Sequence, residues 1–386
     1  MGRDSGRVAI IGAGLAGGAT AFGLVRRGVR NIVLLEQEEI PGYYASGRNA
    51  ALIRELGSKA EIRRLIRHGT RFLTSPPASF PASPGFRRVG SLLLASGKQA
   101  SALHSWIEMD RRDDPDVRML SPREVKSWIG VVEPANMEIA AHTVTDGVID
   151  IHALLHGFLA GARSAGAEIR FHARATDILT KDGRVTGVKI ENGELCECDI
   201  LVNAAGPWAA RVAELAGAAK LPFLTLRRHL AQSGLLEDID PSWPFVWDIT
   251  HEVYFRPESG GVLLCPCDEG PIEPCDPPVD HSQIELLAEK VAVSFPGLKN
   301  VELRRTWACI RTFVEDRQIV VGPDPLLEGF FWVAGLGGNG VGLAPALSEL
   351  VSDLILEHRT PLLTEIEMAA IAPGRFVANR NQIDGR

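Results

Sequence analysis

The sequence has little cysteine, no long apolar run and no apolar leader. Its six cysteines among 386 residues are too few for the dense disulfide network of a small secreted domain. No stretch reaches the roughly 18 uninterrupted apolar residues that indicate a membrane-spanning helix. The chain passes from a short polar start directly into an apolar strand, which is not the pattern of a signal peptide. We therefore expect a cytoplasmic protein without a membrane span.

The sequence also has no excess of basic residues. It carries 41 Lys and Arg against 48 Asp and Glu, a net charge of -7. Proteins that bind nucleic acid usually present a concentrated basic surface, so no nucleic-acid partner is expected. The composition is otherwise that of an ordinary globular protein, and its length suits about two domains.

The chain opens with the pattern of a β-α-β unit. Residues 8–11 and 31–35 are short apolar runs, and residues 15–28 between them have the composition of a helix. Apolar runs of this length predict buried strands, and a helical crossover between them predicts parallel pairing. Further α/β segments follow near residue 146 and near the end of the chain. The nucleotide domain is therefore expected to be discontinuous in sequence.

A glycine loop lies between the first strand and the first helix. Gly12 permits a tight turn, Gly14 lets the backbone approach a pyrophosphate, and Gly17 lets the helix pack closely. The helix N-terminus would supply free N–H groups for the phosphates. Glu36, at the end of the second strand, would accept hydrogen bonds from ribose hydroxyls. A turn without a ligand would leave Glu36 unexplained, but the loop alone does not separate FAD from NAD.

Four further blocks carry a resemblance to a known family. They are residues 41–43 with 46–51, residues 202–206 with Trp208, residues 306–311, and residues 329–334 with the later glycines. With these blocks the chain resembles the D-amino-acid-oxidase superfamily of FAD-dependent oxidoreductases over nearly its whole length. That superfamily includes glycine oxidase, sarcosine oxidase and D-arginine dehydrogenase, and the likeness is greatest to the last. The resemblance selects FAD.

The resemblance implies an α/β fold with two domains. A Rossmann-like FAD-binding domain would comprise residues 1–85, 146–220 and 315–386. A substrate domain with a large antiparallel sheet would comprise residues 86–145 and 221–314. Together with Gly12, Gly14, Gly17 and Glu36, the cofactor-binding residues implied are Ser46, Gly47, Arg48, Asn49, Ala50, Ala175, Ala205, Gly206, Trp208, Gly337 and Gly340.

FAD is expected to be bound without a covalent link. Sarcosine oxidase attaches its flavin through a cysteine at a place similar to Cys309, which keeps a covalent link open as an alternative. The simpler interpretation of Cys309 is a buried apolar side chain. The glycine-rich turn that contains Gly337 and Gly340 would present N–H groups, which stabilise negative charge on a reduced flavin.

The family's reaction is oxidation of the carbon–nitrogen bond of an amino acid or amine, here expected to be a D-amino acid. Hydride passes from the α-carbon to flavin, and the imine hydrolyses to a keto acid and ammonia. Such a site needs a clamp that orients the α-hydrogen. Arg311 is expected to be that clamp, because a guanidinium binds a carboxylate through two parallel hydrogen bonds. The alternative is a structural ion pair.

Three further residues are expected at the substrate. Tyr254 matches a tyrosine that binds the carboxylate, with a core tyrosine as the alternative. Arg228 matches a second substrate-facing arginine, but its neighbour Arg227 leaves the register open because adjacent strand residues face opposite ways. Gly338 would offer its carbonyl to the substrate amine.

The expected substrate pocket departs from that of D-arginine dehydrogenase. Where that enzyme has a glutamate for the cationic side chain, this sequence has Ser91. Where the pocket of D-arginine dehydrogenase has a histidine and a tyrosine, this sequence has Leu52 and Leu56. Burying a guanidinium without a carboxylate partner is costly, so a neutral side chain is expected in preference to arginine.

Several interpretations stay open at this point. The substrate could instead be an N-methyl amine or a 2-hydroxy acid, or the chain could be a non-catalytic FAD-binding subunit. The electron acceptor could be oxygen, a quinone or another carrier. No metal site is expected, because the cysteine pairs 196/198 and 265/267 lack the usual zinc spacing.

Overall fold

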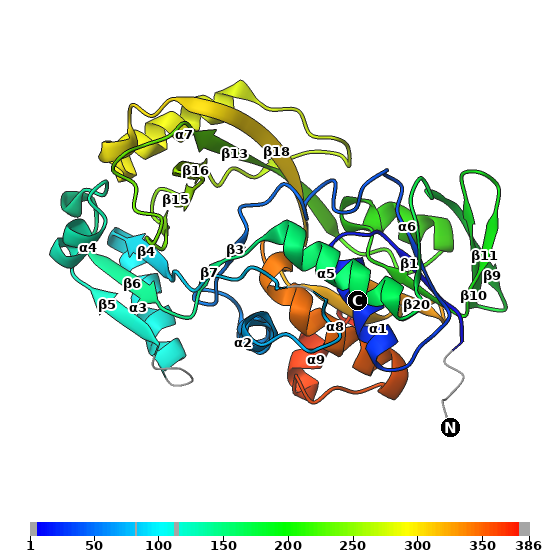
Figure 1. The fold of residues 1–386 in the computed structure, drawn as a ribbon. Helices are drawn as coiled ribbons and strands as arrows, with labels where there is room; N and C mark the ends of the chain where they lie inside the picture. The colour runs from blue at the N-terminus through cyan, green and yellow to red at the C-terminus, as the bar shows by residue number, and fades with distance from the viewer. Residues whose placement is uncertain (1–5, 82, 112–115, 378–386) are drawn as a thin grey trace, which may run out of the picture.

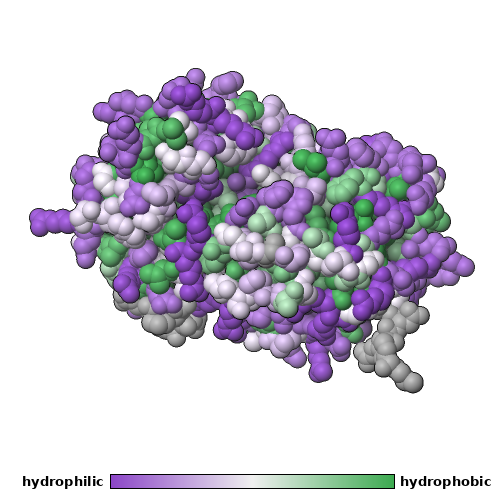
Figure 2. Space-filling model, viewed as in Figure 1, coloured by the Kyte–Doolittle hydropathy of each residue, from purple (hydrophilic) through white to green (hydrophobic). Residues whose placement is uncertain are grey.

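The computed structural model describes residues 6–81, 83–111 and 116–377. Figure 1 shows two parts side by side. One contains the first and last helices around a mainly parallel sheet, and the other is built on a large antiparallel sheet. Hydrophilic side chains cover most of the face seen in Figure 2, with apolar residues in small groups. No helix within the described ranges has both the length and the apolar character to cross a membrane.

The first part is an α/β unit around a six-stranded sheet in the order β19-β20-β12-β1-β2-β8. Neighbouring strands pair in parallel except for β19, which is antiparallel to β20. The sheet draws strands from three separate regions of the chain. They are β1 (Val8–Ile11), β2 (Ile32–Leu35), β8 (Glu168–Arg170), β12 (Ile200–Asn203), β19 (Val320–Pro323) and β20 (Phe330–Ala334).

Two layers cover this sheet. Val8 and Ile10 of β1 pack into a core with α1 (Leu15–Arg26), α5 (Ile151–Ser164) and α8 (Gly340–Glu357). Ala9 and Ile11 face a second core with α6 (Ala209–Ala216) and a three-stranded sheet. That sheet contains β9 (Ala175–Lys181), β10 (Arg184–Ile190) and β11 (Leu195–Glu197). Both faces are buried, which explains why the strand sequences are almost continuously apolar.

The second part is a nine-stranded sheet in the order β17-β13-β16-β15-β14-β4-β6-β5, with β18 also paired to β13. Its pairings are antiparallel except between β14 and β4. Helices α3 (Gly97–Arg111), α4 (Pro122–Trp128) and α7 (His281–Ser294) pack on it. The strands are β4 (Ser91–Ala95), β5 (Val117–Leu120), β6 (Ile139–Thr143), β13 (Phe223–Ser233), β14 (Phe245–Asp248), β15 (Val253–Glu258), β16 (Gly261–Cys265), β17 (Gly270–Pro271) and β18 (Leu303–Val314).

Short elements join or flank the two parts. Strands β3 (Leu52–Ile53) and β7 (Gly147–Val148) form a two-stranded sheet at the junction. Helix α2 (Ala60–Thr74) packs against α8, and α9 (Glu365–Ile371) lies against β19. Single-turn helices occupy residues 134–136, 206–208 and 296–298 of the described chain.

The expected fold class is confirmed: a Rossmann-like α/β part accompanies a part with a large antiparallel sheet. Strands β9 and β10 form a hairpin in which both turn residues, Asp182 and Gly183, have positive φ (51° and 75°). The first helix ends at Arg26, slightly before the expected position.

A close approach between two helices depends on a glycine of α1. A side chain at Gly23 would overlap the carbonyl oxygen of Ser348 in α8. In Figure 1 the two helices lie side by side. Glycine therefore allows α1 and α8 to touch through their backbones.

Gly23→Ala should destabilise the protein. Alanine gains about 1 kcal/mol in helix propensity, but the overlap with a backbone oxygen should cost more, because overpacked cores typically lose about 1–3 kcal/mol. Denaturant unfolding of the two proteins measures the difference. Gly130→Ala is the control, since no atom lies within 4 Å of a side chain placed there. Equal or higher stability of Gly23→Ala would contradict the packing argument.

Candidate active site: two cavities that meet at Arg311

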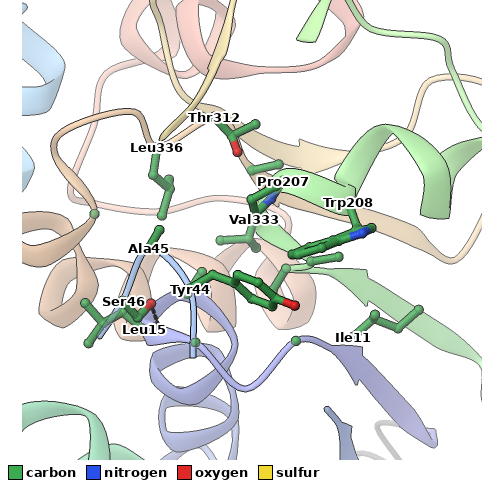
Figure 3. Close-up of a pocket in the computed structure, with 18 of the residues that line it drawn as sticks. Ile11, Leu15, Tyr44, Ala45, Ser46, Pro207, Trp208, Thr312, Val333 and Leu336 are labelled. Atoms are coloured by element: carbon green, nitrogen blue, oxygen red, sulfur yellow. Dashed lines mark hydrogen bonds between the residues drawn. The ribbon is translucent and has the colours of Figure 1, made fainter. Parts of the chain in front are cut away.

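A long groove crosses the carboxyl ends of the parallel strands. It runs from Glu36 and Arg174 at one end, past the glycine loop, to Gly337 and Gly338 at the other. Figure 3 shows side chains that line its middle section. A dinucleotide binds across this edge of a Rossmann-like sheet.

The glycine loop presents free backbone donors to the groove. The N–H of Leu15 donates to the Ser46 hydroxyl (3.0 Å), drawn as a dashed line in Figure 3. The N–H groups of Ala16 and Gly17 have no acceptor among the described residues. Gly12 has φ +105°, a conformation that favours glycine. The start of α1 can therefore receive an anionic phosphate.

Glu36 lies at the polar end of the groove and is 8% exposed. Its carboxylate accepts hydrogen bonds from the N–H groups of Ala13 (2.8 Å) and Glu38 (3.1 Å). Burial raises the pKa of Glu36, whereas these two N–H groups lower it. The carboxylate is thus held in place beside the loop, where it could accept hydrogen bonds from a ribose.

Two aromatic rings form part of the groove's middle. The ring centres of Tyr44 and Trp208 are 4.4 Å apart, and Figure 3 shows both rings beside the groove. The Tyr44 hydroxyl donates to Glu38 (2.6 Å). The hydroxyl of Thr312 is buried without a hydrogen-bond partner in the described structure. An unpaired buried hydroxyl in a groove wall indicates a position that a polar ligand would satisfy.

The far end of the groove is built from a second glycine-rich turn. Gly337 has φ +55° and donates its N–H to Thr312 O (2.8 Å). Helix α8 begins just beyond it with no side-chain cap. The N–H groups of Gly338 and Gly340 have no backbone acceptor among the residues described. These donors could face a flavin carbonyl.

A second cavity of about 700 Å³ opens from this end. Four residues line both the groove and the cavity: Asn49, Arg311, Gly338 and Val341. The second cavity is otherwise walled by α2, the antiparallel sheet and α7. A substrate in this cavity would therefore adjoin the glycine-rich end of the groove.

Arg311 lies at the junction without an acceptor. No hydrogen bond or ion pair joins its guanidinium to any described residue. Arg227, Arg228 and Arg317, in contrast, are each paired with an acid. Arg228, 5% exposed, pairs with Glu269 (3.0 Å), which also holds Arg317 (2.7 Å). Arg228 lines this cavity, whereas Arg227 does not and pairs with Asp280 (2.6 Å).

Tyr254 adds a second unpaired group to the cavity wall. It is 5% exposed, and its hydroxyl has no hydrogen-bond partner within the described structure. Burial raises the pKa of Tyr254 well above its usual value. Its hydroxyl therefore keeps its proton and can donate to an anion.

The cofactor residues expected from sequence divide into two groups. Most line the groove: Gly12, Gly14, Glu36, Ser46, Asn49, Ala175, Ala205, Gly206, Trp208, Gly337 and Gly340. The others lie behind it or beside it. Gly17 packs against Gly12, a side chain at Gly47 would meet Gly42 O at 2.6 Å, Arg48 pairs with Asp276, and Ala50 lines the second cavity.

Of the expected substrate-pocket residues, only Leu52 lines the second cavity. Leu56 is fully buried in a core with α3. Ser91 is also fully buried, and its hydroxyl donates to Asp146 (2.5 Å). The structure therefore does not bring Leu56 or Ser91 to the cavity, because both side chains are taken up by packing or hydrogen bonding behind its wall.

Sequence reasoning missed Arg54 and Trp247. Both line the second cavity, and the Arg54 guanidinium lies over the Trp247 ring, 4.8 Å from its centre. Arg54 lies between two hydrophobic residues and Glu55, so an arginine directed into a cavity had no local signal. Trp247 reads as an ordinary strand residue.

The groove fits the two ends of FAD, with a helix N-terminus for its phosphates and a glycine-rich turn for its flavin. The sequence matches the FAD dependent oxidoreductase (DAO) family over residues 7–354. The FAD-dependent oxidoreductase domain-containing protein 1 of Mus musculus is 27% identical, in an alignment covering 91% of this chain and 81% of that protein.

Solved structures agree with this family in fold. The L-proline dehydrogenase from P. horikoshii has a TM-score of 0.86 at 22% identity, covering 97% of this chain and 98% of that one. The glycine oxidase from Bacillus cereus has a TM-score of 0.79 at 20% identity, covering 92% and 96%. The chain belongs to the DAO family of FAD-dependent oxidoreductases.

Proposed function

We propose that this FAD-dependent oxidoreductase oxidises the carbon–nitrogen bond of a D-amino acid or a related amine. FAD, when bound, supplies a two-electron hydride acceptor. The α-hydrogen leaves the substrate with its electron pair, the nitrogen lone pair forms a C=N bond, and water hydrolyses the imine to a keto acid and ammonia. The residues around the second cavity would bind and orient the substrate for this step.

The unpaired guanidinium of Arg311 carries the proposal. It lies where the groove meets the second cavity, and no carboxylate within the described ranges forms an ion pair with it. A buried or half-buried charge without a partner is unfavourable, so the site favours an anionic ligand. A substrate carboxylate bound to both guanidinium nitrogens would be fixed in position and orientation.

Two further groups support the same substrate orientation. The protonated Tyr254 hydroxyl is buried next to the Cys265 thiol, makes no geometric hydrogen bond in the described structure, and would donate to the carboxylate. Gly338 lies beside Arg311, since a Cβ atom placed at Gly338 would be 3.3 Å from a guanidinium nitrogen. Its carbonyl would accept a hydrogen bond from the amine. Arg228 would contribute positive potential while held by Glu269. Such positioning accelerates reaction by removing the entropy cost of alignment.

The charge of the second cavity disfavours a cationic side chain. Its basic lining residues are Arg54, Arg228, Lys290, Arg311 and Arg317. Its acidic lining residues are Glu252, Asp268 and Glu269. Glu269 already holds two arginines, and Asp268 holds His229 (2.7 Å). A neutral side chain is therefore preferred over arginine, despite the sequence likeness to D-arginine dehydrogenase.

Arg311→Met should remove most substrate turnover while FAD stays bound. Truncating one partner of a buried charge pair costs about 2–5 kcal/mol, so kcat/KM should fall by about 30-fold or more. Anaerobic flavin reduction with a panel of D- and L-amino acids, N-methyl amines and 2-hydroxy acids measures this loss and identifies the substrate class. Arg304→Met, an exposed change on the same strand, is the control. Undiminished reduction by Arg311→Met would overturn the proposed clamp.

Glu36→Ala should weaken FAD binding. Hydrogen bonds to a charged group contribute about 1.5–3 kcal/mol, so the FAD dissociation constant should rise by about 10-fold to 100-fold. Titration of apoprotein with FAD gives this constant. Glu39→Ala, a change at an exposed neighbour, serves as the control. Glu36→Gln keeps the shape of the side chain without its charge and tests whether FAD binding needs the charge. An unchanged constant in Glu36→Ala would remove Glu36 from the proposed site.

We also propose that FAD is bound without a covalent link. Cys309 lines the groove but is only 1% exposed. Burial raises the pKa of its thiol, and a thiol that keeps its proton is a poor nucleophile. Acid precipitation of the holoprotein should release the flavin into the supernatant. Flavin that stays with the pellet, and is released in Cys309→Ala, would show the covalent alternative to be correct.

A further inference from the structure

The second cavity contains a second guanidinium without a carboxylate partner. Arg54 follows β3 and lines this cavity together with Arg311. Its side chain donates to the carbonyl oxygen of Leu56, but no ion pair joins it to a described acidic residue. One carboxylate at Arg311 would leave the positive charge of Arg54 unmatched.

An unpaired donor lies beside Arg54. The indole N–H of Trp247 is buried and has no acceptor in the described structure. The Trp247 ring packs under the Arg54 guanidinium, with 4.8 Å between the guanidinium carbon and the ring centre. An indole nitrogen is only a donor, so both groups require the same kind of ligand atom. Together they present a guanidinium without a carboxylate partner and an indole N–H without an acceptor in the described structure.

The buried Asp146 does not supply that acceptor. Asp146 accepts hydrogen bonds from Ser91 Oγ (2.5 Å) and from the N–H of Glu55 (3.0 Å), and it makes no ion pair with Arg54. Burial, and then the charge of Glu55, raise the pKa of Asp146 to about 8. Near neutral pH its carboxyl therefore carries little negative charge. Burial lowers the pKa of Arg54, the negative charge of Asp146 partly raises it, and the positive charge of Arg311 lowers it again.

We propose that Arg54 and Trp247 form a subsite for a second carboxylate, so that the substrate is an amino acid or secondary amine with two carboxylates. This inference rests on the proposed function, because it assigns the first carboxylate to Arg311. An anion at the subsite would neutralise Arg54 and accept a hydrogen bond from Trp247. It would also reduce the repulsion between Arg54 and Arg311. Acidic substrates would then be preferred over neutral ones, and neutral ones over cationic ones.

Matched pairs of substrates test the subsite. The pairs are glutamate and glutamine, aspartate and asparagine, each as both enantiomers, and iminodiacetate and sarcosine. In the wild-type protein, at least one acid should reduce the flavin anaerobically with a kcat/KM at least 10-fold above that of its partner. Arg54→Met should lower kcat/KM for that acid at least 30-fold and change the partner less than 3-fold.

Two control variants distinguish a loss of the Arg54 charge from a general effect on folding. Arg71→Met removes an exposed arginine from α2 and should leave both members of a pair unchanged. Arg54→Lys should restore part of the preference, because the ammonium keeps the charge but loses the planar fork. No preference for any acid in the wild type, or an equal loss for both members of a pair in Arg54→Met, would overturn the subsite. Equal losses would mean that both arginines hold one carboxylate.

A binding measurement keeps this inference distinct from the proposed function. If no amine reduces the flavin, the proposed function fails, whereas the subsite is still tested by non-reacting ligands. Glutarate or succinate should perturb the bound-flavin spectrum with a dissociation constant at least 10-fold below that of butyrate. Arg54→Met should abolish this difference. Equal affinities for the dicarboxylates and butyrate in the wild type would overturn the second subsite.

Discussion

The long antiparallel pair of β13 and β18 sets the geometry on which the site depends. Figure 1 shows β18 curving from the large sheet to the α/β part. Its register opposes Arg228 to Cys309 and Leu226 to Arg311. Because side chains alternate across a strand, a slip of one residue would turn Arg311 away from the junction of the two cavities. The placement of one charge therefore depends on many backbone hydrogen bonds distant from it.

The two cavities differ in the kind of positive potential that they present. The groove offers backbone N–H groups at the starts of α1 and α8, held by glycine conformations. These dipoles are fixed by the fold and need no counterion. The second cavity instead presents guanidinium groups, some paired and some unpaired. A permanently bound cofactor suits the first arrangement, and a ligand that enters and leaves suits the second.

The sequence predicted what short-range patterns determine. The strands predicted at 8–11 and 31–35 are short apolar runs, so their local signals agree with the fold. The junction of the cavities was harder to predict. Arg54, Trp247 and Arg311 lie far apart in sequence, and only tertiary packing brings them to one wall. Ser91 was assigned to the pocket by position, but its hydrogen bond to Asp146 holds it behind the wall.

The wall shared by the groove and the second cavity links their occupants thermodynamically. Arg311 and Gly338 contribute to both spaces, so an anion bound at Arg311 changes the electrostatic potential at the glycine-rich end of the groove. Binding free energies at coupled sites are reciprocal. A ligand that binds more tightly when the cofactor is oxidised must therefore lower the cofactor's midpoint potential by the equivalent free energy. Substrate and product can in this way set the driving force for electron transfer to the acceptor.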